Sequence, residues 1–185
     1  MRRRAGGFTL IEILVAILII AIMMSAAMIS FNRSSGDEAA RDEAVRFMAL
    51  VQLAQDDAIM QGRDFGLDFA IGGYRFVEFD PYTSQWAETF DDDFLTYRTL
   101  PEGIEFELYL EDQRVLLDPE LDVIEYGDGS SQPDESYAPH LLIFSSGDST
   151  PFELHILYDE IELRVGIQGD LLGNMELMSD EDFEF

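Results

Sequence analysis

Residues 2–31 read RRRAGGFTLIEILVAILIIAIMMSAAMISF, and this stretch decides the architecture of the chain. Three arginines and two glycines precede an apolar run that carries one carboxylate, Glu12, near its start. The 20 residues from Ile13 to Asn32 include no charged residue and no proline. A helix of that length spans about 30 Å, close to the thickness of a bilayer's hydrocarbon core. The stretch therefore predicts a helix that lies in apolar surroundings.

Two simpler interpretations of this stretch stay open. A secretory signal peptide has a basic start and a small-residue cleavage site, which Ser25-Ala26-Ala27 could supply. Glu12 argues against a signal peptide, because a carboxylate at the front of an inserting segment is costly and intramembrane charges are usually functional. A plain membrane anchor tolerates Glu12 at the interface, but it leaves Gly6-Gly7 before Phe8 without a reason.

The motif Gly7-Phe8-Thr9-Leu10-Ile11-Glu12 followed by an apolar helix resembles the class III signal of type IV pilins and type II secretion pseudopilins. The resemblance implies that a membrane prepilin peptidase cuts between Gly7 and Phe8, and that Phe8 is then N-methylated. It also implies that the apolar segment packs in the core of a filament, where Glu12 meets the charged N-terminus of a neighbouring subunit. Neutralisation of Glu12 by its own N-terminus, one helical turn away, is the alternative.

The charge balance is strongly acidic. There are 38 acidic residues and 11 basic ones, and every basic residue is arginine. Removal of residues 1–7 would change the formal net charge from −27 to −30. Such a surface repels nucleic acid and anionic lipid. A solvated, salt-adapted surface explains it more simply than an acidic binding site does. The three arginines before the apolar run predict a cytoplasmic N-terminus and a translocated remainder, which is periplasmic in a Gram-negative bacterium.

Residues 33–62 predict an amphipathic continuation of the helix, because small and apolar residues recur every three or four positions. This apolar face comprises Ala40, Ala44, Phe47 or Met48, Val51, Ala54 and Ala58. The charged residues expected off it are Asp42, Glu43, Arg46, Asp56 and Asp57. The polar residues 32–37 predict an interruption, after which Ser35 or Asp37 caps a renewed helix and Gly36 loosens the joint. Gly62 predicts the helix end.

Residues 63–185 predict an antiparallel β domain, because the apolar period changes from helical to alternating after Gly62. The expected strands are 65–69, 74–78, 104–110, 140–144, 152–158 and 161–167, with turns at 72–73, 100–103 and 145–148. Residues 81–95, which hold Trp86, are expected to form a loop. Residues 111–139 are expected to form a long variable loop with a short strand near 121–126, and residues 179–185 an acidic tail. The fold class is α+β, type IV pilin-like, with a long N-terminal helix packed on an antiparallel sheet or sandwich.

Within the pseudopilins, the β portion resembles the H-type minor subunit of type II secretion, general secretion pathway protein H. The resembling pieces are residues 54–66, 73–76, 100–104, 143–147 and 150–154, together with Trp86. The resemblance implies a leader at 1–7, a transmembrane and filament-core helix at 8–32, and a periplasmic remainder. The implied partners are the major pseudopilin, other minor pseudopilins of a tip complex, the prepilin peptidase and the inner-membrane assembly platform. It implies a structural protein without enzymatic activity or cofactor.

A related interpretation is a FimT-like minor pilin that serves DNA uptake or adhesion. DNA capture requires exposed basic side chains. Beyond residue 114 the only arginine is Arg164, so binding of nucleic acid is disfavoured. An anchored enzyme is a third interpretation, but no catalytic motif supports it.

His140 and His155 lie in strand-like runs and are interpreted as packed or solvated. A calcium site is a further alternative, but its candidate ligands fit no EF-hand spacing. These candidates are Asp118, Glu120, Asp122 and Asp128.

Overall fold

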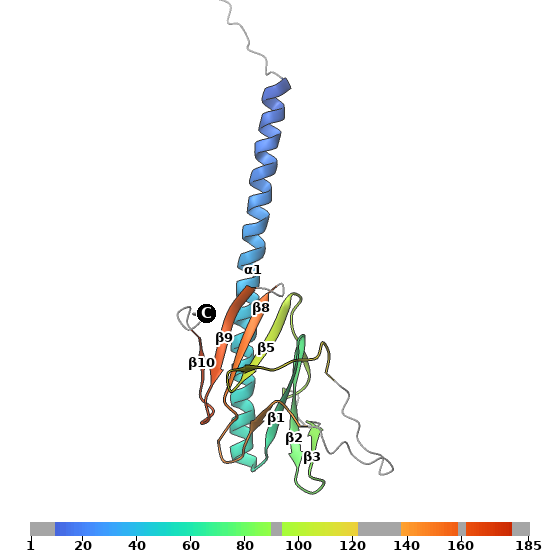
Figure 1. Ribbon diagram of the computed structural model, residues 1–185, viewed down its shortest axis with the longest axis vertical. Coiled ribbons are helices and arrows are strands. Elements are labelled where there is room, and N and C mark those ends of the chain that lie inside the picture. Colours follow the sequence, from blue (N-terminus) through green and yellow to red (C-terminus); the bar gives the residue numbers. More distant parts are fainter. Residues whose placement is uncertain (1–9, 90–93, 122–137, 159–161, 179–185) are drawn as a thin grey trace, which may run out of the picture. The chain divides into compact units, whose positions relative to one another are not determined.

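The computed structural model describes residues 10–89, 94–121, 138–158 and 162–178, and of 25–35 and 162–164 it describes the backbone alone (Figure 1). The chain divides into two units, residues 1–36 and 37–185, and each is considered by itself. The helix α1 spans Leu10–Gln61 and contributes to both units. The strands all belong to the second unit.

Helix α1 continues through the polar residues 32–37 without a break. The predicted interruption, with Ser35 or Asp37 capping a renewed helix, is therefore wrong. The physical reason is that one glycine, Gly36, costs a helix only about 1 kcal/mol, and good helix formers follow it. The predicted end is confirmed. Gly62 adopts a φ of 66°, and its N–H donates to the carbonyl of Ala58 over 2.9 Å.

The inner face of α1 between residues 37 and 61 is confirmed almost as predicted. Ala40, Ala44, Phe47, Val51, Ala54 and Ala58 are all buried. Phe47, rather than the half-buried Met48, is the large residue of this face. The four alanines place little bulk between the helix and the strands, so the backbones can approach closely. The predicted exposure of Glu43 is wrong, because its side chain is only 2% exposed.

The first sheet has the strand order β3-β2-β1-β7, and β4 also pairs with β2; all its pairings are antiparallel. Its strands are β1 (Phe65–Ala70), β2 (Gly73–Asp80), β3 (Gln85–Glu88), β4 (Arg98–Thr99) and β7 (Leu141–Ile143). The predicted hairpin is confirmed as β1 and β2, although its turn lies at Ile71-Gly72. The prediction of a loop over residues 81–95 is wrong, because Trp86 lies in β3 and its ring centroid is 5.2 Å from that of Phe79.

The second sheet has the order β10-β9-β8-β5-β6, again antiparallel. Its strands are β5 (Ile104–Leu110), β6 (Gln113–Arg114), β8 (Phe152–Tyr158), β9 (Glu162–Gly169) and β10 (Met175–Leu177). Strands β5 and β8 have the predicted bounds. The two- and three-residue strands β6 and β10 were not predicted. The predicted strand near 121–126, except Leu121, and the tail 179–185 lie outside the described residues.

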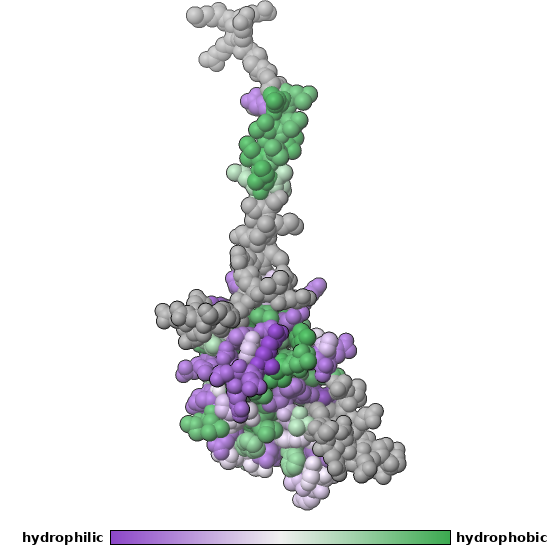
Figure 2. Space-filling model, viewed as in Figure 1, coloured by the Kyte–Doolittle hydropathy of each residue, from purple (hydrophilic) through white to green (hydrophobic). Residues whose placement is uncertain are grey.

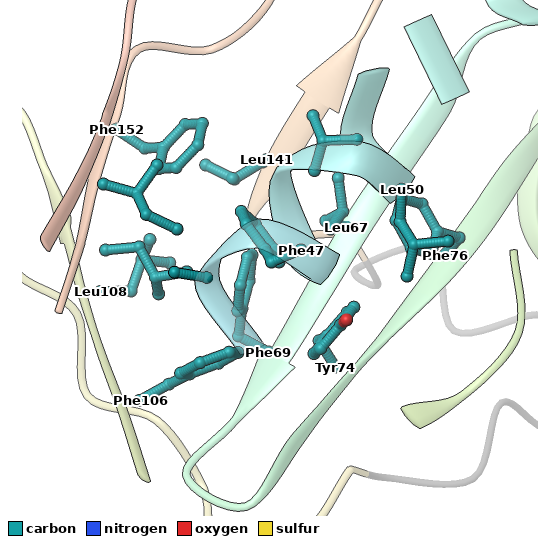
Figure 3. Close-up of a cluster of buried hydrophobic side chains, with 14 of the residues drawn as sticks. Phe47, Leu50, Leu67, Phe69, Tyr74, Phe76, Phe106, Leu108, Leu141 and Phe152 are labelled. Carbon is teal, nitrogen blue, oxygen red and sulfur yellow. The ribbon is translucent and has the colours of Figure 1, made fainter. Parts of the chain in front are cut away.

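The core of the second unit forms where α1 meets both sheets, and Phe47 lies at its centre (Figure 3). The Phe47 ring centroid is 5.9 Å from Phe69 and 5.4 Å from Tyr74 in the first sheet. It is 6.1 Å from Phe106 and 6.2 Å from Phe152 in the second sheet. Most of these rings meet edge to face, an arrangement that aromatic quadrupoles favour. One helical residue therefore joins two sheets, which confirms the α+β class.

Candidate functional site

The segment from Leu10 to Met24 carries apolar side chains around the whole helix, and its large ones are between 47% and 82% exposed. They are Leu10, Ile11, Ile13, Leu14, Val15, Ile17, Leu18, Ile19, Ile20, Ile22, Met23 and Met24. Figure 2 shows this segment as a nearly continuous hydrophobic surface. A helix that is apolar on all sides does not present a polar face to water. The segment therefore requires lipid, other helices or both around it.

Glu12 lies in the first turn of α1 and is exposed within this apolar segment. A carboxylate in that position interacts favourably with the positive end of the helix dipole. Gly7 and Phe8, where cleavage and methylation are predicted, lie outside the described residues. Among the residues that the structure describes, no helix meets the length and apolarity needed to cross a membrane. The predicted span of 8–32 includes residues and side chains outside that description, so it stays a prediction.

A buried polar cluster between α1 and β2 was missed by the sequence analysis. The Tyr74 hydroxyl donates to Glu43 Oε1 over 3.2 Å, and Arg46 donates to Glu43 Oε2 over 2.8 Å. Burial, and then the neighbouring Glu43 carboxylate, raise the pKa of Tyr74 well above its usual value. The cluster ties the helix to β2. Its sequence signal is weak: Glu43 immediately precedes Ala44, at the flank of the apolar face.

A second buried polar cluster lies on the face of the first sheet that points away from Phe47. Asp68 and Arg75 are directly opposite in the β1–β2 register and form a 2.8 Å ion pair. Arg75 also approaches Glu88 at 3.4 Å. His140 Nδ1 lies 2.8 Å from Asp68 Oδ1 and accepts the Phe69 N–H over 3.1 Å. His140 therefore belongs to a structural network, as the packed interpretation expects.

The other candidate ligands are spread over the molecule. His155 contacts Glu153 and lies with its ring centroid 4.7 Å from that of Tyr109. Asp118 and Glu120 are exposed, whereas the remaining two calcium candidates of the 111–139 loop lie outside the described residues. Within the described residues, no group of three or more histidine, aspartate or glutamate side chains could hold a metal ion. The calcium alternative therefore stays untested.

An open groove of about 830 Å³ lies between the end of α1 and the β2–β3 hairpin. Its described lining is rich in carboxylates: Asp57, Asp64, Glu78, Asp80 and Glu88. Several of them already have partners, since Glu78 pairs with Arg63 at 2.7 Å and Asp64 Oδ1 accepts the Ser145 N–H. The described lining includes neither histidine nor cysteine. No nucleophile with an adjacent base is present in it, so the groove offers no arrangement for covalent catalysis.

Comparison with known proteins agrees with these observations. Residues 2–28 match the family described as the prokaryotic N-terminal methylation motif. Type II secretion system protein H of Pseudomonas aeruginosa is 30% identical over 154 residues, which cover 83% of this chain and 84% of that protein. The chain belongs to the type II secretion system protein H family. The protein H of Aeromonas hydrophila is 28% identical over 187 residues, covering 99% of this chain and 98% of that protein.

Solved structures of protein H family members share the fold. The minor pseudopilin EpsH from the type 2 secretion system of Vibrio cholerae aligns with a TM-score of 0.60 and 25% identity, covering 76% of this chain and 96% of that one. The solution structure of Escherichia coli GspH aligns with a TM-score of 0.57 at 20% identity, which supports the fold alone. These likenesses support the protein H interpretation and not the FimT-like alternative.

Proposed function

We propose that this protein H family member is a minor pseudopilin, a structural subunit of the periplasmic pseudopilus that drives export of folded proteins across the outer membrane. The observation that carries the proposal is the helix at residues 10–24, apolar on all sides, inside a matched methylation motif. The folded unit at 37–185 adds the fold of a known minor pseudopilin. The protein then works by packing and by partner contacts. We propose no catalytic step and no cofactor.

Maturation begins with the leader at residues 1–7. In the proposal, the prepilin peptidase hydrolyses the Gly7–Phe8 bond, and the amine of Phe8 is then methylated. Support comes from the motif match over residues 2–28 and from the Gly7-Phe8 pair that directly precedes the apolar segment. Methylation leaves the amine positively charged, so it can still attract a carboxylate.

The proposed location is the inner membrane of a Gram-negative bacterium, with a single span. The arginines at positions 2–4 favour a cytoplasmic N-terminus, so the domain at 37–185 lies in the periplasm. The same orientation presents the Gly7–Phe8 bond to a membrane peptidase. The inner-membrane assembly platform would then receive the subunit and pass it into the filament.

Glu12 is proposed to guide assembly by pairing with the methylated N-terminus of a neighbouring subunit, most directly the major pseudopilin. In an apolar helical bundle, an isolated carboxylate is costly, and a cationic partner offsets that cost. The pairing is possible at only one axial offset between the two helices. It therefore sets the axial register of two helices that otherwise present only apolar side chains to each other. Other minor pseudopilins of a tip complex would contact the folded domain.

The processing step is tested by intact mass of the protein extracted from membranes. We expect a chain that begins at N-methyl-Phe8, and we expect Gly7→Val to retain the leader because the bulky side chain blocks the peptidase. A mature N-terminus near residue 27 or 28 would show that the segment is an ordinary signal peptide. The filament role would then be wrong, since the helix would be absent from the mature protein.

A further inference from the structure

Near the end of α1, three separate segments expose large apolar side chains. Ile59 and Met60 of α1 are 56% and 82% exposed, Phe144 after β7 is 38% exposed, and Leu171 and Leu172 between β9 and β10 are 59% and 71% exposed. We call these five residues the helix-end patch. On the face seen in Figure 2, hydrophobic side chains gather where Figure 1 places the β9–β10 turn.

Direct contacts hold the three segments together. Gln55 Nε2 donates to the Gly173 carbonyl over 3.0 Å, which ties α1 to the β9–β10 turn. The Ser149 N–H donates to the Leu171 carbonyl over 2.9 Å, which ties the β7–β8 turn to the same place. Ile59 Cδ1 lies 3.7 Å from the point that a Cβ on Gly147 would occupy. The patch is therefore one surface on a fixed frame.

The two leucines are not needed to form the turn that carries them. Asp170 Oδ1 accepts the N–H groups of Leu172 and Asn174 over 2.8 and 2.9 Å, and Gly173 supplies the φ of 78°. Polar side chains at 171 and 172 would fit this turn equally well. Exposed large apolar side chains that gather on a domain with a well-packed core often mark an interaction surface.

Carboxylates border the helix-end patch on every segment that builds it. Asp56 and Asp57 precede Ile59, Asp148 follows Gly147, and Asp170 precedes Leu171. Residues 55–61, 144–149 and 170–174 contain no arginine or lysine. The Asn174 side chain, hydrogen-bonded to Asp170, lowers the pKa of that carboxyl and keeps it charged. An apolar centre with a charged border is the usual composition of a protein interface.

We propose that the helix-end patch docks a protein partner whose contact surface has apolar side chains at its centre and lysines or arginines around them. Charge complementarity selects this occupant. A second copy of the chain would bring the same four carboxylates of each copy face to face, and like charges oppose that contact. The choice of other pseudopilins as candidate partners rests on the proposed function.

The test is photo-crosslinking in the bacterium with the full chain. A photoreactive amino acid replaces Met60, and epitope-tagged pseudopilins of the same secretion system are the probes. We expect a cross-link to one of them. Its yield should fall at least about tenfold in Leu171→Ser/Leu172→Ser and in Asp56→Arg/Asp148→Arg, a loss typical of interface hot spots. Leu116→Ser, at a leucine that is 95% exposed outside the patch, is the matched control and should change nothing.

Charge reversal in the partner completes the test. When the partner's basic border residues are replaced by glutamate, the cross-linking yield of the Asp56→Arg/Asp148→Arg variant should return to the wild-type level. A cross-link to a second copy, no cross-link in the wild type, or a yield that neither double variant changes would overturn the docking proposal. A second photoreactive position at Leu18 reports filament association independently. If Leu18 cross-links and Met60 does not, the docking proposal fails and the proposed function stands; if neither does, both fail.

Discussion

At the residue scale, we propose different roles for two glutamates of α1. Glu43 is buried and already bound by Tyr74 and Arg46, so it contributes to the folded domain. Glu12 lies in an apolar segment whose large side chains are exposed. A carboxylate in apolar surroundings is most useful where it selects one partner geometry among many. Glu12 should therefore affect assembly, whereas Glu43 and Tyr74 should affect stability.

Replacement of Glu12 by alanine should leave cleavage and membrane insertion intact, because the proposed cleavage is at Gly7–Phe8 and the change removes a charge from the apolar segment. Cysteine cross-linking between this helix and that of the major pseudopilin should fall. The effect should be milder than in a major subunit, because we expect a minor subunit to make few such pairs. Neutralisation of Glu12 by its own N-terminus predicts normal assembly instead. Unchanged cross-linking at equal protein levels, with normal secretion, would rule out the register role.

Replacement of Tyr74 by phenylalanine should lower the free energy of unfolding by about 1–2 kcal/mol at pH 7, because the buried Glu43 loses one donor. Since the folded-state pKa of Tyr74 is raised, its stabilisation is complete below the ordinary tyrosine pKa of 10.0 and is lost as pH rises above it. The difference in the free energy of unfolding between wild type and Tyr74→Phe should therefore become smaller above pH 10. Urea unfolding of residues 33–185 at pH 7 and 10.5 measures this difference. A larger difference at pH 10.5 than at pH 7 would contradict the prediction.

The residue scale also shows the limit of sequence patterns. The β1–β2 hairpin was predicted, but its turn was placed one residue too late, at 72–73. That turn would put Asp68 opposite Val77, whereas the observed register puts it opposite Arg75, so the ion pair was missed. The Tyr74–Glu43 bond joins residues 31 positions apart and depends on how the helix lies against β2. Helical periodicity locates a face to within about one residue on each side, and Glu43 lies at that boundary.

At the element scale, α1 between residues 37 and 61 packs against both sheets of the domain. Its small residues were predictable because they repeat at helical spacing. Strand β5 was predictable because it alternates over its seven residues, and β8 because it alternates from Phe152 to Ile156. Strands β4, β6 and β10 have two or three residues, too few for any alternation to be visible. Trp86 was assigned to a loop because β3 has only four residues beside an acidic run.

Phe47 should be the most costly single residue of this helix to remove. Phe47→Ala leaves a cavity between both sheets and should lower the free energy of unfolding by about 3–5 kcal/mol. Val45→Ala, at a side chain on the same helix that is 60% exposed, is the matched control and should change it by less than about 0.5 kcal/mol. Urea unfolding of residues 33–185 provides both values. Similar losses for the two variants would contradict the position of Phe47 at the centre of the core.

At the scale of the whole molecule, the chain combines a segment with no core of its own and a unit that has one. Residues 37–185 bury a cluster of aromatic side chains around Phe47, whereas the apolar side chains of residues 10–24 find no cover within the described chain. A subunit of this kind is complete only in an assembly. The strong negative charge keeps the folded unit soluble and favours partners with basic surfaces.

Whether this chain serves protein export is decided by the secreted proteins of a bacterium that lacks its gene. Comparison of culture supernatant and periplasm by quantitative mass spectrometry should show type II substrates retained in the periplasm. The wild-type gene should restore their release, whereas residues 33–185 exported to the periplasm by a cleavable signal peptide should not. An unchanged supernatant in the deletion strain, or restoration by residues 33–185 alone, would contradict a pseudopilus subunit that works through its apolar helix.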